Sequence, residues 1–176
     1  MMKFLIVAIE HNWQLVAHGP ETPERTKAKD RLRSVLDRAI GDRGVDLICE
    51  ESDPCRLSIA QRIAYEHNPR IPWENITMSA QERLEAGIYD ALLDRPSHVI
   101  KEPSDYHFEI KHRIPEDGIR EQFFATEATQ AADGVRAKSI LILCGDMHAD
   151  FLKQILEASL HQAEVNRNLV ARKYWQ

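Results

Sequence analysis

The chain has 176 residues, of which 43% are hydrophobic and 29% are charged. These values favour one globular domain with a sizeable core, residues 1–176, and exclude a disordered chain. The formal net charge of −5 gives no broad basic field, so we expect no nucleic-acid partner. The basic run from Arg25 to Arg33 is interpreted as the solvated face of a helix.

The cysteines and the apolar runs favour a cytoplasmic protein. Cys49, Cys55 and Cys144 cannot all pair within one chain, and two of them end apolar runs, where reduced, buried thiols are common. The apolar start of the chain is short and meets Glu10 at once, so we predict a first strand there instead of a signal sequence. No other apolar run approaches the roughly 20 residues of a membrane span, and we expect no membrane partner.

The first half of the chain alternates strand, helix and strand. Residues 4–9 are continuously apolar, as in a central strand of a parallel sheet. Thr22-Pro23-Glu24 is typical of a helix start, and Gly41 and Gly44 are expected to end that helix. Residues 45–49 then form the second predicted strand. This order builds a parallel pair with a helical crossover.

The second half of the chain continues this alternation, with weaker signals for where each helix and strand ends. We predict helices over residues 53–68, 79–95, 115–132 and 148–160, strands over 139–144 and 163–171, and a surface loop over 97–115. Together these elements predict an α/β fold in three layers, with a mainly parallel sheet and helices on both faces.

Ionisable residues follow three of the predicted strands. Glu10-His11, Glu50-Glu51 and Asp146 with His148 each stand at a carboxyl-terminal strand end, where open parallel sheets bind ligands. A carboxylate and an imidazole there can exchange protons near neutral pH. The set His11, Glu50 and His148 could equally hold a divalent metal, and the sequence does not choose between the two chemistries.

Simpler roles exist for several of these residues, and other sites lack support. Asp146 could cap the helix that follows it, and Glu51 could face solvent beside Glu50. No glycine-rich phosphate loop and no Gly-x-Ser-x-Gly elbow occur in the sequence. Cys144 lies inside an apolar strand, so we interpret it as a buried thiol instead of a nucleophile.

The segment Ile140-Leu141-Ile142-Leu143-Cys144-Gly145-Asp146-Met147-His148 resembles the closing Gly-x-x-His motif of the erythromycin esterase/ChaN-like and TraB/TIKI superfamily. Glu50 resembles the family's glutamate after the second strand. Glu10-His11 stands where the family has its first motif, although it lacks that motif's glycine and spacing. Arg120-Glu121-Gln122-Phe123-Phe124-Ala125 resembles the segment whose arginine faces the family's site.

This resemblance implies a site without fixing a substrate. Members of the superfamily include metal-free esterases, metal-dependent peptidases and haem-associated proteins, and this chain is shorter than most of the enzymes. We therefore expect hydrolysis of an ester or amide bond in a small-molecule or peptide substrate. The predicted catalytic residues are Glu10, His11, Glu50, His148 and Arg120.

In this scheme His11 or Glu50 activates water, His148 is the second imidazole, and Arg120 stabilises developing negative charge. One alternative is a non-catalytic protein of the same fold that binds a metal or small ligand, or acts as an immunity-type protein. Another is an interaction module that uses its exposed helices. No cofactor is predicted other than the divalent metal left open above, and the sequence does not give the oligomeric state.

Overall fold

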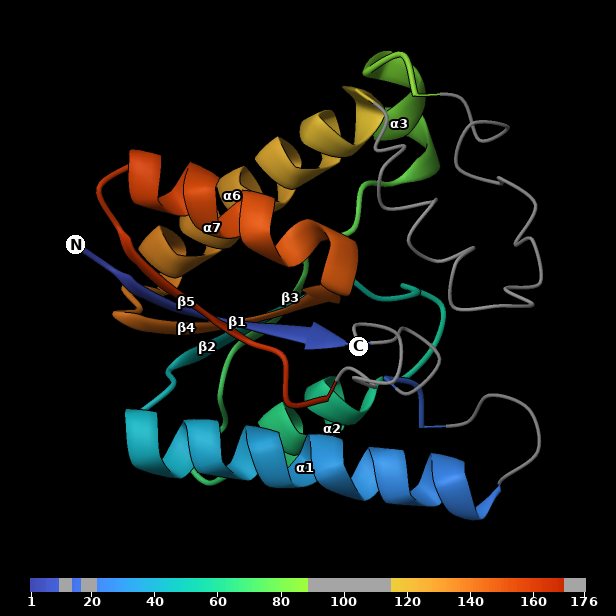
Figure 1. Ribbon diagram of the computed structural model, residues 1–176. Coiled ribbons are helices and arrows are strands. Elements are labelled where there is room, and N and C mark those ends of the chain that lie inside the picture. The colour runs from blue at the N-terminus through green and yellow to red at the C-terminus, as the bar shows by residue number, and fades with distance from the viewer. Residues whose placement is uncertain (10–13, 17–21, 89–114, 170–176) are drawn as a thin grey trace.

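Five parallel strands form the centre of the computed structural model, which describes residues 1–9, 14–16, 22–88 and 115–169 (Figure 1). The strands are β1 (Lys3–Ile9), β2 (Leu47–Glu50), β3 (Trp73–Asn75), β4 (Ser139–Gly145) and β5 (Gln162–Asn166). Their order across the sheet is β3-β2-β4-β1-β5, so the long strands β4 and β1 lie in the middle. The register pairs Lys3 with Ser139 and Ile9 with Gly145.

Helices cover both faces of this sheet, and the predicted three-layer α/β fold is confirmed (Figure 1). The helices α1 (Pro23–Arg43) and α2 (Ile59–Glu66) pack on one face. The helices α6 (Pro115–Val135) and α7 (Asp146–Ala158) pack on the other. A short helix, α3 (Ala80–Glu85), follows β3 and begins with the predicted capping box at Ser79.

Alternation along the strands divides the core into two clusters. In β1, Phe4 and Ile6 face α6 and α7, whereas Leu5 and Val7 face α1 and α2. All four side chains are buried, because both faces of a central parallel strand are covered. Burying one such side chain stabilises the fold by about 1.5–3 kcal/mol. The continuous apolar runs of the sequence are therefore explained by two cores that share one sheet.

Several element boundaries differ from the sequence prediction. Helix α1 runs through Gly41 and ends at Gly44, which adopts the left-handed conformation with φ 59°. Helix α2 begins at Ile59, capped by Ser58, because the Asp53 carboxylate instead accepts a hydrogen bond from Cys55 N at 2.9 Å and forms a turn. Strand β3 lies between the predicted helices over 53–68 and 79–95, where no strand was predicted, since three residues give too short a pattern to recognise.

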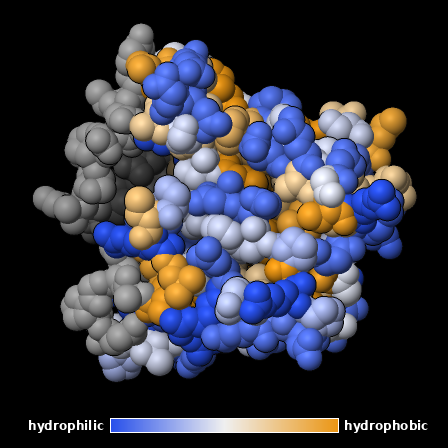
Figure 2. All heavy atoms as spheres, turned by 180° about the vertical axis from the view of Figure 1, so that it is seen from behind, coloured by the Kyte–Doolittle hydropathy of each residue, from blue (hydrophilic) through white to orange (hydrophobic). Residues whose placement is uncertain are grey.

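The surface of the described residues is mainly hydrophilic, with small, separate apolar patches on the face shown in Figure 2. Large exposed apolar side chains come from many elements and include Leu57, Tyr65, Leu84, Ile119, Val135, Met147, Phe151 and Leu160. Leu84 of α3 and Phe151 of α7 thus lie on the outer sides of their helices. No helix in the described ranges is long and apolar enough to cross a membrane.

Candidate functional site

Two adjacent glutamates at the end of β2, Glu50 and Glu51, point to opposite faces of the sheet. Glu50 is fully buried on the side of α2, where the Ser58 hydroxyl donates to Glu50 Oε2 at 2.5 Å. Trp73 Nε1 donates to the same oxygen at 2.9 Å, and Gln14 Nε2 donates to Oε1 at 3.3 Å. These three donors come from segments before α2, in β3 and after β1. Glu50 therefore joins neighbouring segments to the end of β2 from within the core.

Glu51 points to the other face, toward α6 and α7. Its Oε1 lies 2.7 Å from Arg120 Nη2, and its Oε2 accepts a hydrogen bond from Gly145 N at 3.0 Å. The Glu51 side chain is only 5% exposed. Its carboxylate thus links the carboxyl end of β4 to the first turns of α6.

The imidazole of His148 is oriented by a second buried carboxylate. His148 Nδ1 lies 3.0 Å from Glu121 Oε1, and the two side chains are 7% and 1% exposed. The ring also meets Phe124 edge-on, with centroids 5.6 Å apart. A carboxylate accepts hydrogen bonds, so this contact places the ring hydrogen on Nδ1 and makes Nε2 the proton-accepting atom.

Glu51, Arg120, Glu121 and His148 together form what we call the His148 cluster. His148 Nε2 lies 3.9 Å from Glu51 Oε1, the same oxygen that contacts Arg120. The cluster lies at the carboxyl-terminal ends of β2 and β4, where parallel sheets bind ligands. Arg120 is its most exposed side chain, at 21%, so solvent reaches the cluster mainly beside this guanidinium.

The structure brings together two of the predicted site residues, His148 and Arg120. Glu50 is directed away from them, because it and Glu51 alternate along β2. Glu51 does not have the simpler role of facing solvent beside Glu50, since it is buried between α6 and the end of β4. Glu10 and His11 lie outside the described residues.

Glu121 was missed as a site residue, although it lies beside Arg120 in the segment that resembles the superfamily. Its only sequence signal was this neighbourhood, because the direction of a helix face depends on packing. Asp146 does not have the simpler role of capping α7, because α7 begins at Asp146 itself and its carboxylate contacts Arg167.

The predicted metal set of His11, Glu50 and His148 does not assemble from the described residues. Glu50 and His148 make their contacts on opposite faces of the sheet, and His11 lies outside the described ranges. Within those ranges, no three His, Cys, Asp or Glu side chains are arranged to hold a metal ion.

Two of the cysteines are buried in the sheet. Burial raises the pKa of the Cys144 thiol well above its usual value, and the nearby carboxylates of Glu51 and Asp146 raise it further. Burial likewise raises the pKa of Cys49. Cys55 is exposed. Because the thiolate is the reactive form, the geometry favours Cys144 as a core residue.

We expect one thiol per folded chain to react rapidly with Ellman's reagent, and all three cysteines to react after unfolding. The fast thiol is Cys55, since the other two are buried and protonated. The control is Cys55→Ser, which should show no fast phase. A second fast thiol in the native protein, if lost in Cys144→Ser, would instead make Cys144 a candidate nucleophile.

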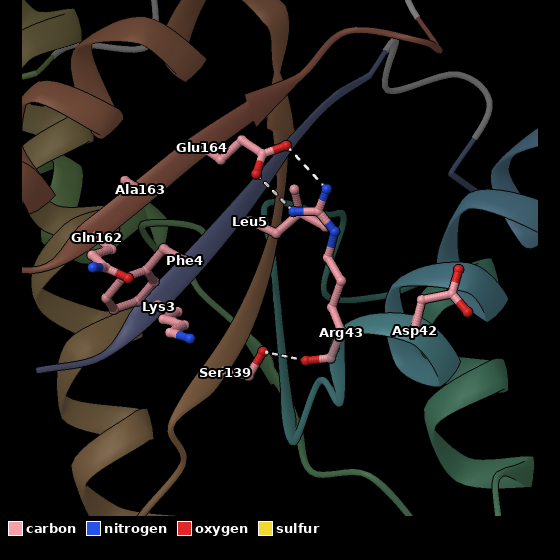
Figure 3. A pocket seen from close by; sticks show the side chains of 9 residues that line it. All are labelled: Lys3, Phe4, Leu5, Asp42, Arg43, Ser139, Gln162, Ala163 and Glu164. Carbon is pink, nitrogen blue, oxygen red and sulfur yellow. Dashed lines mark hydrogen bonds and ion pairs between the residues drawn. The ribbon is translucent and has the colours of Figure 1, made fainter.

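A groove of about 440 Å³ lies at the opposite end of the sheet, beside the amino-terminal ends of β1, β4 and β5 (Figure 3). Arg43 of α1 reaches Glu164 of β5 there, with its two terminal nitrogens 2.7 and 3.1 Å from the carboxylate oxygens. The hydrogen bond from Arg43 lowers the pKa of Glu164. None of the described residues that line this groove belongs to the predicted site.

Comparison with known proteins gives no further assignment. No family model, no curated protein and no solved structure matches this chain. The likeness to the erythromycin esterase/ChaN-like and TraB/TIKI superfamily therefore stays a prediction from the motifs alone.

Proposed function

We propose that the chain hydrolyses an ester or amide bond at the His148 cluster. The observation that carries this proposal is the 3.0 Å contact between His148 Nδ1 and the buried Glu121 carboxylate. A carboxylate in this position holds the imidazole in one tautomer and stabilises the imidazolium formed when Nε2 takes a proton. The resemblance of Gly145 to His148 to a hydrolase motif supports the same reaction.

The cluster supplies the groups that such a reaction needs. His148 Nε2 would take a proton from water as the water oxygen attacks the substrate carbonyl carbon. Arg120 has N–H groups beyond the one directed at Glu51, and these would stabilise the oxyanion that forms. The imidazolium would then return the proton to the leaving alcohol or amine as its bond to carbon breaks. Glu51 would hold Arg120 and the first turn of α7 in place.

A second candidate is a binding protein that has the same cluster and no turnover. It is favoured by the burial of the cluster, because Glu51, Glu121 and His148 are each less than a tenth exposed. In that case the ionic contacts would mainly hold α6 and α7 against the sheet. The two candidates differ in one measurable property, the presence of turnover that depends on His148.

The test is a panel of 4-nitrophenyl esters and aminoacyl 4-nitroanilides, assayed with the purified protein and with His148→Gln. Parallel assays with EDTA, Mn²⁺ and Zn²⁺ detect any metal requirement. We expect wild-type turnover of at least one ester or amide and only background rates for the variant. Equal rates for both proteins on every substrate would reject the hydrolase and favour the binding protein.

A further inference from the structure

Arg167 connects the end of the last strand to the first turn of the helix that carries His148. It directly follows β5, and its Nε lies 2.8 Å from Asp146 Oδ1. Its Nη2 lies 2.8 Å from Asp150 Oδ2. Asp146 begins α7 and Asp150 lies one turn later, so His148 belongs to the same turn of the helix and lies between them in the sequence.

The first turn of α7 has no side-chain cap. The first N–H groups of a helix have no partner within the helix, and the N-cap residue, Gly145, offers no side chain to accept from them. Asp146 and Asp150 are like charges one turn apart, which repel unless a cation lies between them. The planar fork of arginine can satisfy both carboxylates at once, in a way that a point charge cannot.

We propose that Arg167 is a positioning residue for His148, an inference that rests on the proposed function of the His148 cluster. Two sets of contacts fix the turn: Glu51 accepts from Gly145 N, and Arg167 binds Asp146 and Asp150. Between them they determine where His148 Nε2 points relative to Glu51. Arg167 binds Asp146 and Asp150 of α7 and would act on the cluster through this helix.

A variant of Arg43 is the matched control that tests whether Arg167 has a purely structural role. Arg43 also makes a two-pronged contact with a carboxylate, and it ties the same strand, β5, to α1. The Arg43–Glu164 pair is partly exposed, like the Arg167 contacts, but lies at the opposite end of the sheet. Loss of a strand-to-helix tie should therefore affect both arginine variants alike, whereas loss of positioning should affect only Arg167.

The experiment compares wild type with Arg167→Gln, Arg167→Lys and Arg43→Gln. Histidine side chains labelled with ¹⁵N are observed by NMR across a pH series, with His148 assigned from His148→Gln, and thermal midpoints are recorded for each protein. The NMR signals report which ring nitrogen carries the hydrogen and how His148 titrates. Kinetics on the best substrate of the panel separate kcat from KM.

We expect Arg167→Gln to change the His148 nitrogen signals and to lower kcat by about 10- to 100-fold with little change in KM. Arg167→Lys should recover part of this loss, and Arg43→Gln should match wild type in both readouts. Wild-type His148 signals in Arg167→Gln, or equal changes in Arg43→Gln, would overturn the proposal.

If Arg167→Gln does not fold, the Arg167→Lys variant provides the test instead. His148 signals identical to wild type in Arg167→Lys would then contradict the positioning role of Arg167. If wild type shows no turnover, the proposed hydrolysis fails while the NMR comparison still decides the role of Arg167.

Discussion

Glu121→Gln is expected to lower kcat of the proposed hydrolysis by about 1,000- to 10,000-fold, with a smaller effect on substrate binding. An amide has no charge to stabilise the imidazolium, and its N–H group can donate to His148 Nδ1 and so favour the wrong tautomer. Glu121 is 1% exposed and contacts Nδ1 at 3.0 Å, so solvent does not replace the lost carboxylate. Steady-state kinetics and the ¹⁵N signals of His148 measure the two consequences separately.

The control for this variant is Glu127→Gln, which makes the same change on a half-buried residue further along α6. It should keep wild-type kcat and wild-type His148 signals. A Glu121→Gln protein that folds and turns over at the wild-type rate would show that the orientation of His148 by Glu121 is not needed, and the proposed mechanism would then be wrong.

The layers of the fold could be predicted because the long central strands carry their own evidence. β1 and β4 are continuous apolar runs, which only a strand covered on both faces explains. Proline after Thr22 and glycine at position 44 mark the ends of the helix between β1 and β2. Such signals are local, so they need no knowledge of the packing partners.

The site was less predictable because it depends on which face each side chain takes. Glu50 and Glu51 are both acidic and adjacent, and a shift of one residue along β2 exchanges their faces. The alternation that places Cys49 in the α6 and α7 core and Ile48 in the other core selects Glu51 for the cluster. That assignment requires knowing which face α6 and α7 cover, and the sequence does not provide it.

Glu50→Ala is expected to destabilise the protein by about 3 kcal/mol or more, whatever its activity. Glu50 is fully buried and accepts from Ser58, Trp73 and Gln14, so its removal leaves buried donors without this acceptor. The truncated side chain also leaves a cavity between α2 and the sheet. Chemical denaturation followed by circular dichroism, with kinetics on the folded fraction, measures the loss.

The matched control is Glu74→Ala, which removes an exposed glutamate from the neighbouring strand β3 and should change the stability by less than about 0.5 kcal/mol. Variants of Glu50 and of Glu51 should then have different phenotypes. Glu50 would govern stability, and Glu51 would govern turnover through Arg120 and Gly145. A Glu50→Ala protein as stable as wild type but inactive would reverse this division. It would restore the catalytic role that the resemblance to the superfamily implies for Glu50.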